Sequence, residues 1–190
     1  MEAFEQFVAL AMESEGLVVS GALKFNVKRK TRKAAYDEYQ THGFEVDLVG
    51  ARSDRLVLAT VKSFFGSRGV VAEHVIGDES SYAKWYALLN QPDVRDAVVT
   101  GAATRFGYDQ SQVEMRLYAG RFSTKASENR VRSWAAEQVV GGGPIRVFDA
   151  KGVVATVREV AAPKQYRDSA VLATLKVLEA TGALRPQDGA

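Results

Sequence analysis

The sequence predicts an α/β protein in which helices flank a central sheet, and three observations support this class. Apolar residues recur at helical spacing in several segments, they alternate or run together as in strands in others, and the two kinds of segment are interleaved along the chain. The chain of 190 residues is also 46% hydrophobic and 25% charged, which is the composition of an ordinary globular protein. We therefore expect one substantial core, or a core domain with an appendage.

The first 62 residues predict one helix and then three strands. In residues 2–15, apolar side chains recur at positions 4, 7, 8 and 11, the spacing of one buried helical stripe, and Gly16 is a natural stop. The β-branched and apolar run of residues 17–27 predicts the first strand, and the basic and polar stretch after it predicts a connection. Residues 44–50 and 55–62 predict two further strands, joined by a turn at ARSD.

Residues 63–120 predict helices and then a fourth strand. A helix that begins near residue 80 or 81 places four large side chains on one face: Tyr82, Trp85, Tyr86 and Leu89. At this spacing we expect the aromatic rings in the core rather than stacked on bases. A further helical segment follows Pro92, and residues 112–120 alternate apolar and polar side chains as a strand does.

Residues 121–190 predict an extension of helix, two strands and helix. The first helix lies near 126–138, and the strands IRVFDA and VVATVREV meet at a turn at Lys151 and Gly152. A last helix runs from about Ser169 to Thr181. The extension either forms a unit beside the core of residues 1–120 or packs with that core as one domain.

Composition excludes several classes of protein. No apolar run reaches the roughly 20 residues that span a bilayer, and the acidic start MEAFEQF lacks the basic and apolar regions of a secretory signal. The absence of cysteine excludes disulfides and thiolate metal sites, and having only two histidines, His42 and His74, argues against a structural zinc. A cytoplasmic protein without a membrane partner is the expectation.

Positive charge is concentrated in one segment. Residues 24–33 carry six lysines and arginines and no acid, whereas the whole chain has a net charge of only +2. Such a stretch suits a polyanion such as a nucleic-acid backbone, and a solvated loop without a partner is the alternative. The candidate phosphate contacts are five cations of this segment and one arginine between glycines further along: Lys28, Arg29, Lys30, Arg32, Lys33 and Arg68.

Four polar residues of the second and third strands are predicted to share one surface. Alternation places positions 44, 46 and 48 on one face of the second strand and positions 45, 47 and 49 on the other. With a tight turn at residues 53–54, position 47 lies opposite 60 and position 45 opposite 62; with a four-residue loop, position 47 lies opposite 58. Either register brings together Glu45, Asp47, Thr60 and Lys62.

This group has the chemistry of a metal-dependent phosphodiester site. A divalent ion such as Mg²⁺ polarises a phosphate and lowers the pKa of the attacking water, and it prefers carboxylates, carbonyl oxygens and waters as ligands. Asp47 is the candidate central ligand, with Glu45 and the backbone carbonyl of Val61 as further ligands. Lys62 is a candidate for stabilising charge on the phosphate. A surface ion pair across a hairpin is the alternative.

The stretch FEVDLVG … LVLATVKS resembles the motif of the restriction-endonuclease-like PD-(D/E)xK nuclease superfamily, an aspartate followed on the next strand by acid-x-lysine. The resemblance covers about residues 1–120 and implies a mixed sheet with the element order αβββαβ, a Mg²⁺ or Mn²⁺ cofactor, and an endo- or exodeoxyribonuclease. It also implies catalytic roles for Asp47 and Lys62. The helix FEQFVALAMESEGLVV resembles the first helix of that superfamily, which makes Glu5 a second catalytic carboxylate and metal ligand; a solvent-facing glutamate near a helix N-terminus is the alternative.

Thr60 departs from the motif, because the superfamily usually has an acid or glutamine at this position and a hydroxyl is a poorer Mg²⁺ ligand. Glu45 or Glu73 replaces the lost charge, or Asp47, Glu5 and waters hold one ion with reduced affinity, or the site is inactive. The expected function is a metal-dependent nuclease-like protein that cleaves or binds DNA. The alternatives are a catalytically inactive nucleic-acid-binding or regulatory protein on the same fold, and a protein-interaction module; a homodimer is compatible with each.

Overall fold

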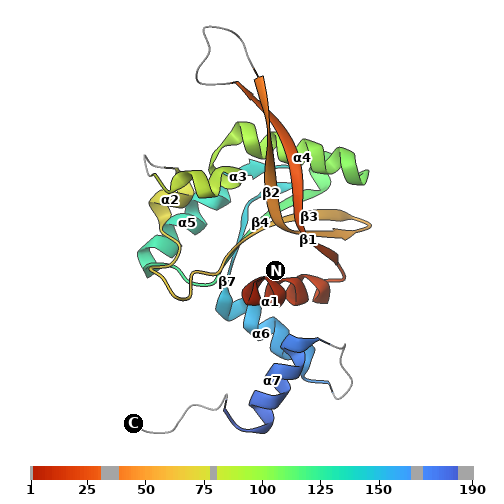
Figure 1. Ribbon diagram of the computed structural model, residues 1–190, viewed down its shortest axis with the longest axis vertical. Coiled ribbons are helices and arrows are strands. Elements are labelled where there is room, and N and C mark those ends of the chain that lie inside the picture. Colours follow the sequence, from red (N-terminus) through yellow and green to blue (C-terminus); the bar gives the residue numbers. More distant parts are fainter. Residues whose placement is uncertain (1, 31–38, 78–80, 164–168, 184–190) are drawn as a thin grey trace.

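A mixed sheet of five strands forms the centre of the protein (Figure 1). The computed structural model describes residues 2–30, 39–77, 81–163 and 169–183. The strands lie in the order β1-β2-β3-β4-β7; β1, β2 and β3 pair in antiparallel fashion, and β4 and β7 continue the sheet in parallel. Their bounds are Val18–Lys30, Tyr39–Arg52, Arg55–Lys62, Val113–Ala119 and Arg146–Asp149, and a separate small ribbon pairs β5 (Val139–Val140) with β6 (Gly143–Pro144).

Helices cover both faces of this sheet, as the sequence predicts. One face packs against α1 (Ala3–Ser14) and α6 (Ala150–Ala161), and α7 (Ala170–Ala180) extends the same core by packing on α6. The other face packs against α2 (Ala72–Ile76), α3 (Ala87–Asn90), α4 (Pro92–Phe106) and α5 (Lys125–Glu137), with short 3₁₀ turns at Ala83–Tyr86 and Gln110–Gln112. The protein therefore has one hydrophobic core on each side of a mixed sheet. Within the described residues, no helix combines the length and the apolar content that crossing a bilayer requires.

The predicted patterns explain α1 and β4 directly. At the start of α1, Glu2 and Glu5 form a reciprocal capping box, which satisfies backbone N–H groups that the first helical turn leaves without a partner. Val8 and Met12, one turn apart, are fully buried against the sheet. In β4, the alternating apolar side chains all enter the core on the α2–α5 face, which confirms the predicted strand.

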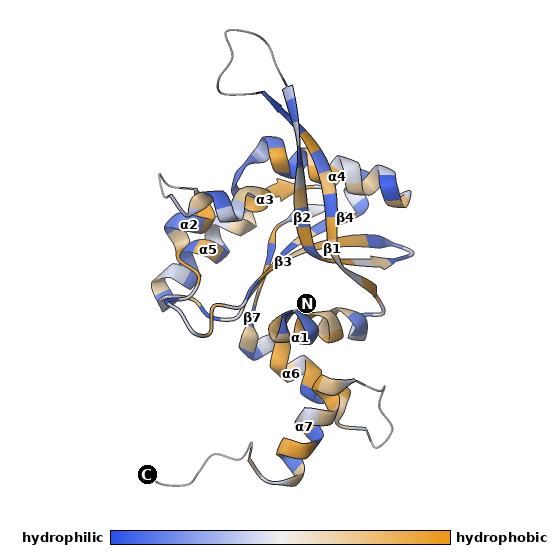
Figure 2. Cartoon of the chain, in the orientation of Figure 1, coloured by the Kyte–Doolittle hydropathy of each residue, from blue (hydrophilic) through white to orange (hydrophobic). Residues whose placement is uncertain are grey.

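The ribbon of β1 and β2 is longer than predicted. Both strands continue through the stretch expected to be a connection, β1 as far as Lys30 and β2 from Tyr39 onward. The ribbon passes α4 and its far end projects beyond the helices (Figure 1), and the far end of β1 is hydrophilic (Figure 2). Because the far part of the ribbon is mostly exposed, no alternation of apolar side chains marks all of it as strand in the sequence.

An interruption in the ribbon changes the face to which its side chains point. Leu23 pairs with Val46 and Gly21 pairs with Leu48, while Ala22 between them has a φ of 54°, in the left-handed region. Val46 consequently belongs to the core on the α2–α5 face, and Leu48 belongs to the core beneath α1. Val49 lies in the same core as Val46. The prediction that positions 44, 46 and 48 share one face and positions 45, 47 and 49 the other is therefore wrong, because the regular alternation of a strand fails at this interruption.

The stretch VVATVREV is helix α6 rather than a strand. The N-cap residue Asp149 accepts the backbone N–H of Gly152 at 2.8 Å, and the buried residues Val153, Val157 and Ala161 recur at helical spacing. The β-branched residues favour a strand locally, but burying this stripe against α1 decides the structure. The strand before it, β7, pairs with β4 and so belongs to the central sheet.

The aromatic segment after residue 80 also differs from the prediction. A 3₁₀ turn followed by the four-residue α3 replaces the long helix, so the four large side chains do not share one face. Tyr86 and Leu89 are buried as expected, whereas Tyr82 is 50% exposed and Trp85 is 56% exposed. The expectation that Tyr82 and Trp85 belong to the core is wrong.

Candidate functional site

The turn between β2 and β3 sets the register of the candidate site. Arg52 pairs with Arg55 and Leu48 pairs with Ala59, which is the register that a tight turn at residues 53–54 predicts. The backbone pairing of β2 with β3 ends at Leu48 and Ala59. Next to this end, the backbone N–H of Val61 donates instead to a side-chain atom, Asp47 Oδ2, at 2.6 Å. Asp47 therefore lies where β2 parts from β3, with its carboxylate fixed against the backbone of β3.

The charges predicted for this site act on Asp47. Burial raises the pKa of its carboxyl, Lys62 and the Val61 N–H lower it, and the negative charges of Glu5 and Glu45 raise it again. The net result is a pKa above the ordinary value of 3.8. The fold thus brings the lysine of β3, the glutamate of α1 and the glutamate of β2 within electrostatic range of one half-buried carboxylate, which a cation would stabilise.

The carbonyl of Val61 faces the same edge of β3 as its N–H. In an extended strand the N–H and C=O groups of one residue point to the same neighbour. The N–H of Val61 points to Asp47 on β2, whereas the carbonyl of the next residue, Lys62, accepts the N–H of Gly120 at 2.8 Å on the β4 side. The geometry is therefore compatible with the predicted use of the Val61 carbonyl beside Asp47.

Lys62 and Thr60 contribute unequally to the exposed surface of the site. The ammonium of Lys62 lies 5.9 Å from the centre of the Tyr86 ring, a distance at which a cation is attracted to the ring face. Thr60, in contrast, is 5% exposed and lies within the sheet. Thr60, which stands where the resembled motif usually has an acid or glutamine, is therefore nearly enclosed by protein.

The other predicted carboxylates have partners of their own. Glu5 Oε2 accepts the N–H of Glu2 at 2.9 Å, so Glu5 caps α1 as well as acting on Asp47. Glu45 lies 3.8 Å from the ammonium of Lys24 in an exposed ion pair. Glu73, expected as a replacement for the missing acid, is bound to Arg130 of α5. Among the described residues, no three His, Asp or Glu side chains form a group arranged to hold a metal ion.

The basic segment forms part of the projecting ribbon. Lys24, Lys28 and Lys30 alternate with half-buried or buried residues and so lie along one exposed face of β1. Arg29 is paired with Asp93 of α4 at 3.2 Å.

Three predicted phosphate contacts remain: Arg32, Lys33 and Arg68. Arg32 and Lys33 lie outside the described residues. Arg68 instead lines a pocket beside α2.

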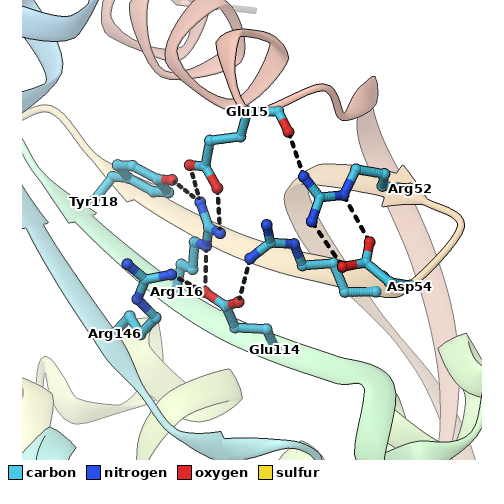
Figure 3. A network of polar contacts seen from close by, with 8 residues as sticks. Glu15, Arg52, Asp54, Glu114, Arg116, Tyr118 and Arg146 are labelled. Atoms are coloured by element: carbon cyan, nitrogen blue, oxygen red, sulfur yellow. Dashed lines mark hydrogen bonds and ion pairs between the residues drawn. The ribbon is translucent and has the colours of Figure 1, made fainter.

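A buried ionic network is the largest polar feature that the sequence analysis missed (Figure 3). Arg116 on β4 has no exposed surface, and its guanidinium donates to both carboxylate oxygens of Glu15, at 2.6 and 2.8 Å. It also donates to Glu114 at 2.6 Å and to the hydroxyl of Tyr118 at 3.0 Å. A sequence pattern could have indicated this network. Glu114, Arg116 and Tyr118 alternate along β4 with the apolar residues of its other face, so three polar groups share one face of a central strand.

The same network joins the end of α1 to the sheet. Arg52 donates to the carbonyl of Glu15 at 2.8 Å and holds Asp54 at the β2–β3 turn through two further bonds. Those bonds lower the pKa of Asp54 to about 2. Because α1 carries Glu5 and the turn sets the register of Asp47, the network fixes two of the elements that form the candidate site.

Comparison of the chain with protein-family models, with curated proteins and with solved structures found no significant match.

Proposed function

We propose that the protein acts on nucleic acid, and that it binds the phosphodiester backbone at the site of Asp47 and Lys62 with a divalent cation. One observation carries the proposal: where β2 and β3 part, the half-buried carboxylate of Asp47 is bound at 2.6 Å by the backbone N–H of Val61, the residue before Lys62. The sequence resemblance to the nuclease motif assigns its aspartate and lysine to Asp47 and Lys62. The lysine-lined ribbon provides a second cationic surface for the phosphates on either side.

The residues present fit a hydrated Mg²⁺ or Mn²⁺ better than a cation enclosed by protein. Mg²⁺ keeps several waters and is held by one or two carboxylates together with substrate phosphates. Within the described part of the chain, the Oδ1 atom of Asp47 accepts no hydrogen bond, so Asp47 can anchor β3 with one oxygen and bind a cation with the other. Glu5, Glu45 and the Val61 carbonyl are the further candidate ligands, directly or through water.

Each side chain then has a defined task. A bound divalent ion would polarise the phosphate and lower the pKa of a water. Asp47 holds that ion, Lys62 stabilises negative charge that develops on the phosphate, and Lys24, Lys28 and Lys30 bind the backbone outside the site. We expect DNA to be the substrate class, and cleavage to be hydrolytic.

A second candidate function is nucleic-acid binding without cleavage, and Thr60 favours it. A buried, neutral hydroxyl occupies the position at which the resembled motif usually has an acid or glutamine, and the described residues form no group of three acidic or histidine ligands. A single carboxylate gives weaker metal binding than two. In this alternative the fold retains the cationic surface and has lost the hydrolysis.

Cleavage assays with plasmid and single-stranded DNA distinguish the two functions. The protein is incubated with each substrate in Mg²⁺ and in Mn²⁺, beside Asp47→Ala, Lys62→Ala and the exposed-site control Lys151→Ala. Cleavage by the wild type and the control, lost in both site variants, supports the enzyme. Salt-sensitive binding by all four proteins without cleavage supports the alternative. Cleavage that survives Asp47→Ala would show that the activity resides elsewhere.

A further inference from the structure

A pocket beside the candidate site is lined by aromatic rings. It has a volume of about 440 Å³ and lies between the loop after β3 and the segment that leads into α3. Six of its lining residues carry the argument: Phe64, Arg68, His74, Tyr82, Trp85 and Tyr86. A pocket of this size, open to solvent, accommodates a small planar ligand.

Two of these rings are exposed although they are in contact with each other. Tyr82 and Trp85 are 50% and 56% exposed, and their ring centres are 5.5 Å apart at nearly a right angle. The His74 ring packs at a tilt on Tyr82, with 4.9 Å between centres. The rings therefore support one another at the rim of the pocket, where the Trp85 side chain remains largely open to solvent.

The pocket is joined to the candidate site through Tyr86. Tyr86 lines the pocket, and its ring also lies 5.9 Å from the ammonium of Lys62. The loop from β3 to α2 is held at both ends by backbone bonds, from Gly120 N–H to the Lys62 carbonyl and from Val70 N–H to the Arg121 carbonyl, each at 2.8 Å. The pocket wall is thus fixed by the sheet and begins just after Lys62 ends β3.

The charge of the pocket complements an anion attached to an aromatic ring. Its described lining residues include Arg68 and His74 and no carboxylate. Planar faces suit a heteroaromatic ring, and a guanidinium suits a phosphate oxygen. Both features together describe a nucleotide.

We propose that this pocket binds one unstacked base of a single-stranded nucleic acid, with Tyr82 and Trp85 stacking on the base and Arg68 contacting a neighbouring phosphate. The inference rests on the proposed function and names its substrate class. A base within a duplex is not available to such a pocket, so the substrate is a single strand, a frayed end or a loop. Stacking tolerates any base, so we expect little sequence preference.

The test compares two ligands that carry the same charge. Fluorescence anisotropy measures binding of a labelled thymidine oligonucleotide, and of an equally long deoxyribose-phosphate chain without bases, to the full-length protein at fixed salt. The wild type should prefer the oligonucleotide by roughly 5- to 150-fold, the range for one base stacked on an aromatic side chain. Trp85→Ala and Tyr82→Ala should reduce this preference towards one.

Phe106→Ala is the matched control. Phe106 is also an exposed aromatic residue, at 37%, but it ends the 15-residue helix α4, roughly 20 Å from the α3 end of that helix. This variant should keep the full preference for bases. Because Tyr82 and Trp85 are exposed, thermal unfolding should show all three variants folded at the temperature of the assay.

The outcomes separate this inference from the function on which it rests. If the wild type binds both ligands equally well, or if the preference survives in Trp85→Ala and Tyr82→Ala, the pocket does not read bases, while the proposed nucleic-acid function stands. If the wild type binds neither ligand nor a duplex, both proposals fail. Competition by thymidine monophosphate as strong as that by the oligonucleotide would identify a free nucleotide as the ligand and overturn the strand as substrate.

Discussion

Two polar clusters lie in the same sheet and differ in how completely their charges are compensated. Arg116 is wholly buried, and the four hydrogen bonds described above compensate its charge. Although burial opposes its charge, the hydrogen bonds to its partners, those to Glu15 foremost, raise its pKa still further above the ordinary value. Asp47 is half-buried, has one hydrogen bond from the described residues, and has a raised pKa because burial outweighs its compensation.

The difference indicates different roles. A buried charge with satisfied hydrogen bonds fixes the arrangement of the elements that supply its partners, here β4 and the end of α1. A carboxylate whose ionised form is disfavoured in the fold is characteristic of a functional site, since a ligand can supply what the protein does not. We therefore assign the Arg116 network to architecture and propose that the Asp47 site serves binding.

The largest effect should follow from breaking the satisfied cluster. Glu15→Ala leaves the buried Arg116 without its bidentate partner, and we expect a loss of about 3 kcal/mol in the free energy of unfolding. Chemical denaturation measures this loss, with the exposed Glu137→Ala as the control. Equal, small effects in the two variants would show that the network does not hold α1 against the sheet.

Divalent cations should stabilise the folded protein through the Asp47 site and not through the Arg116 network. At ten times the dissociation constant, a ligand that binds only the folded state adds about 1.4 kcal/mol to the free energy of unfolding. We expect the melting temperature of the wild type to rise with Mg²⁺ or Mn²⁺ and that of Asp47→Asn to stay constant. The same rise in both proteins would place the cation elsewhere.

Removing the charge of Asp47 should itself stabilise the fold by a smaller amount. Because the pKa of Asp47 is raised, the folded protein holds its proton more tightly than the unfolded chain, and stability falls as pH rises from 3.8 through the folded pKa. Asp47→Asn removes this cost and keeps an oxygen to accept the Val61 N–H. Its melting temperature should exceed that of the wild type at neutral pH, and the difference should vanish below pH 3.8. A wild type that is the more stable protein at neutral pH would contradict this.

The smallest change in the free energy of unfolding is expected from breaking an exposed ion pair. Lys24 and Glu45 are 3.8 Å apart with side chains 68% and 47% exposed, so Lys24→Ala should change the free energy of unfolding by less than about 0.5 kcal/mol. If Lys24 contacts a phosphate, the variant should lower the salt dependence of DNA binding by about one unit of slope. Lys125→Ala removes a lysine of similar exposure, 76%, that pairs with Glu128 on α5, and should leave that slope unchanged. A slope unaltered by Lys24→Ala would remove this lysine from the binding surface.

The sequence predicted the elements whose signals are local. The stripe on α1, the alternation in β4 and the turn between β2 and β3 are each decided by a few neighbouring residues, and the structure confirms them. Residues 150–161 could not be assigned from propensity, because their β-branched residues favour a strand and only packing against α1 makes the helix preferable. The exposed Tyr82 and Trp85 escaped prediction for a related reason, since the helix that would have buried them is replaced by a short turn.

The candidate site was predictable in part. The tight turn at residues 53–54, one of the two registers considered, is present, but the regular alternation that grouped Asp47 with Lys62 fails in β2 at the interruption beside Ala22. The bond from Val61 to Asp47 could not be foreseen, because it exists only where the backbone ladder between β2 and β3 ends. Arg116 was overlooked because its partner Glu15 is distant in the sequence.

The interruption at Ala22 separates two tasks that share the same pair of strands. On one side of it, the tight turn and the pairs from Val18 to Gly21 fix the position of Asp47. On the other side the ribbon packs into the core as far as Val27, and only its last three pairs, which join Lys28–Lys30 to residues 39–41, lie beyond the last buried side chain. The charges of this end can therefore be exchanged without removing a buried side chain or a pair beside Asp47. Substitutions at the far end of the ribbon should therefore change the affinity for a polyanion without changing the proposed chemistry at Asp47.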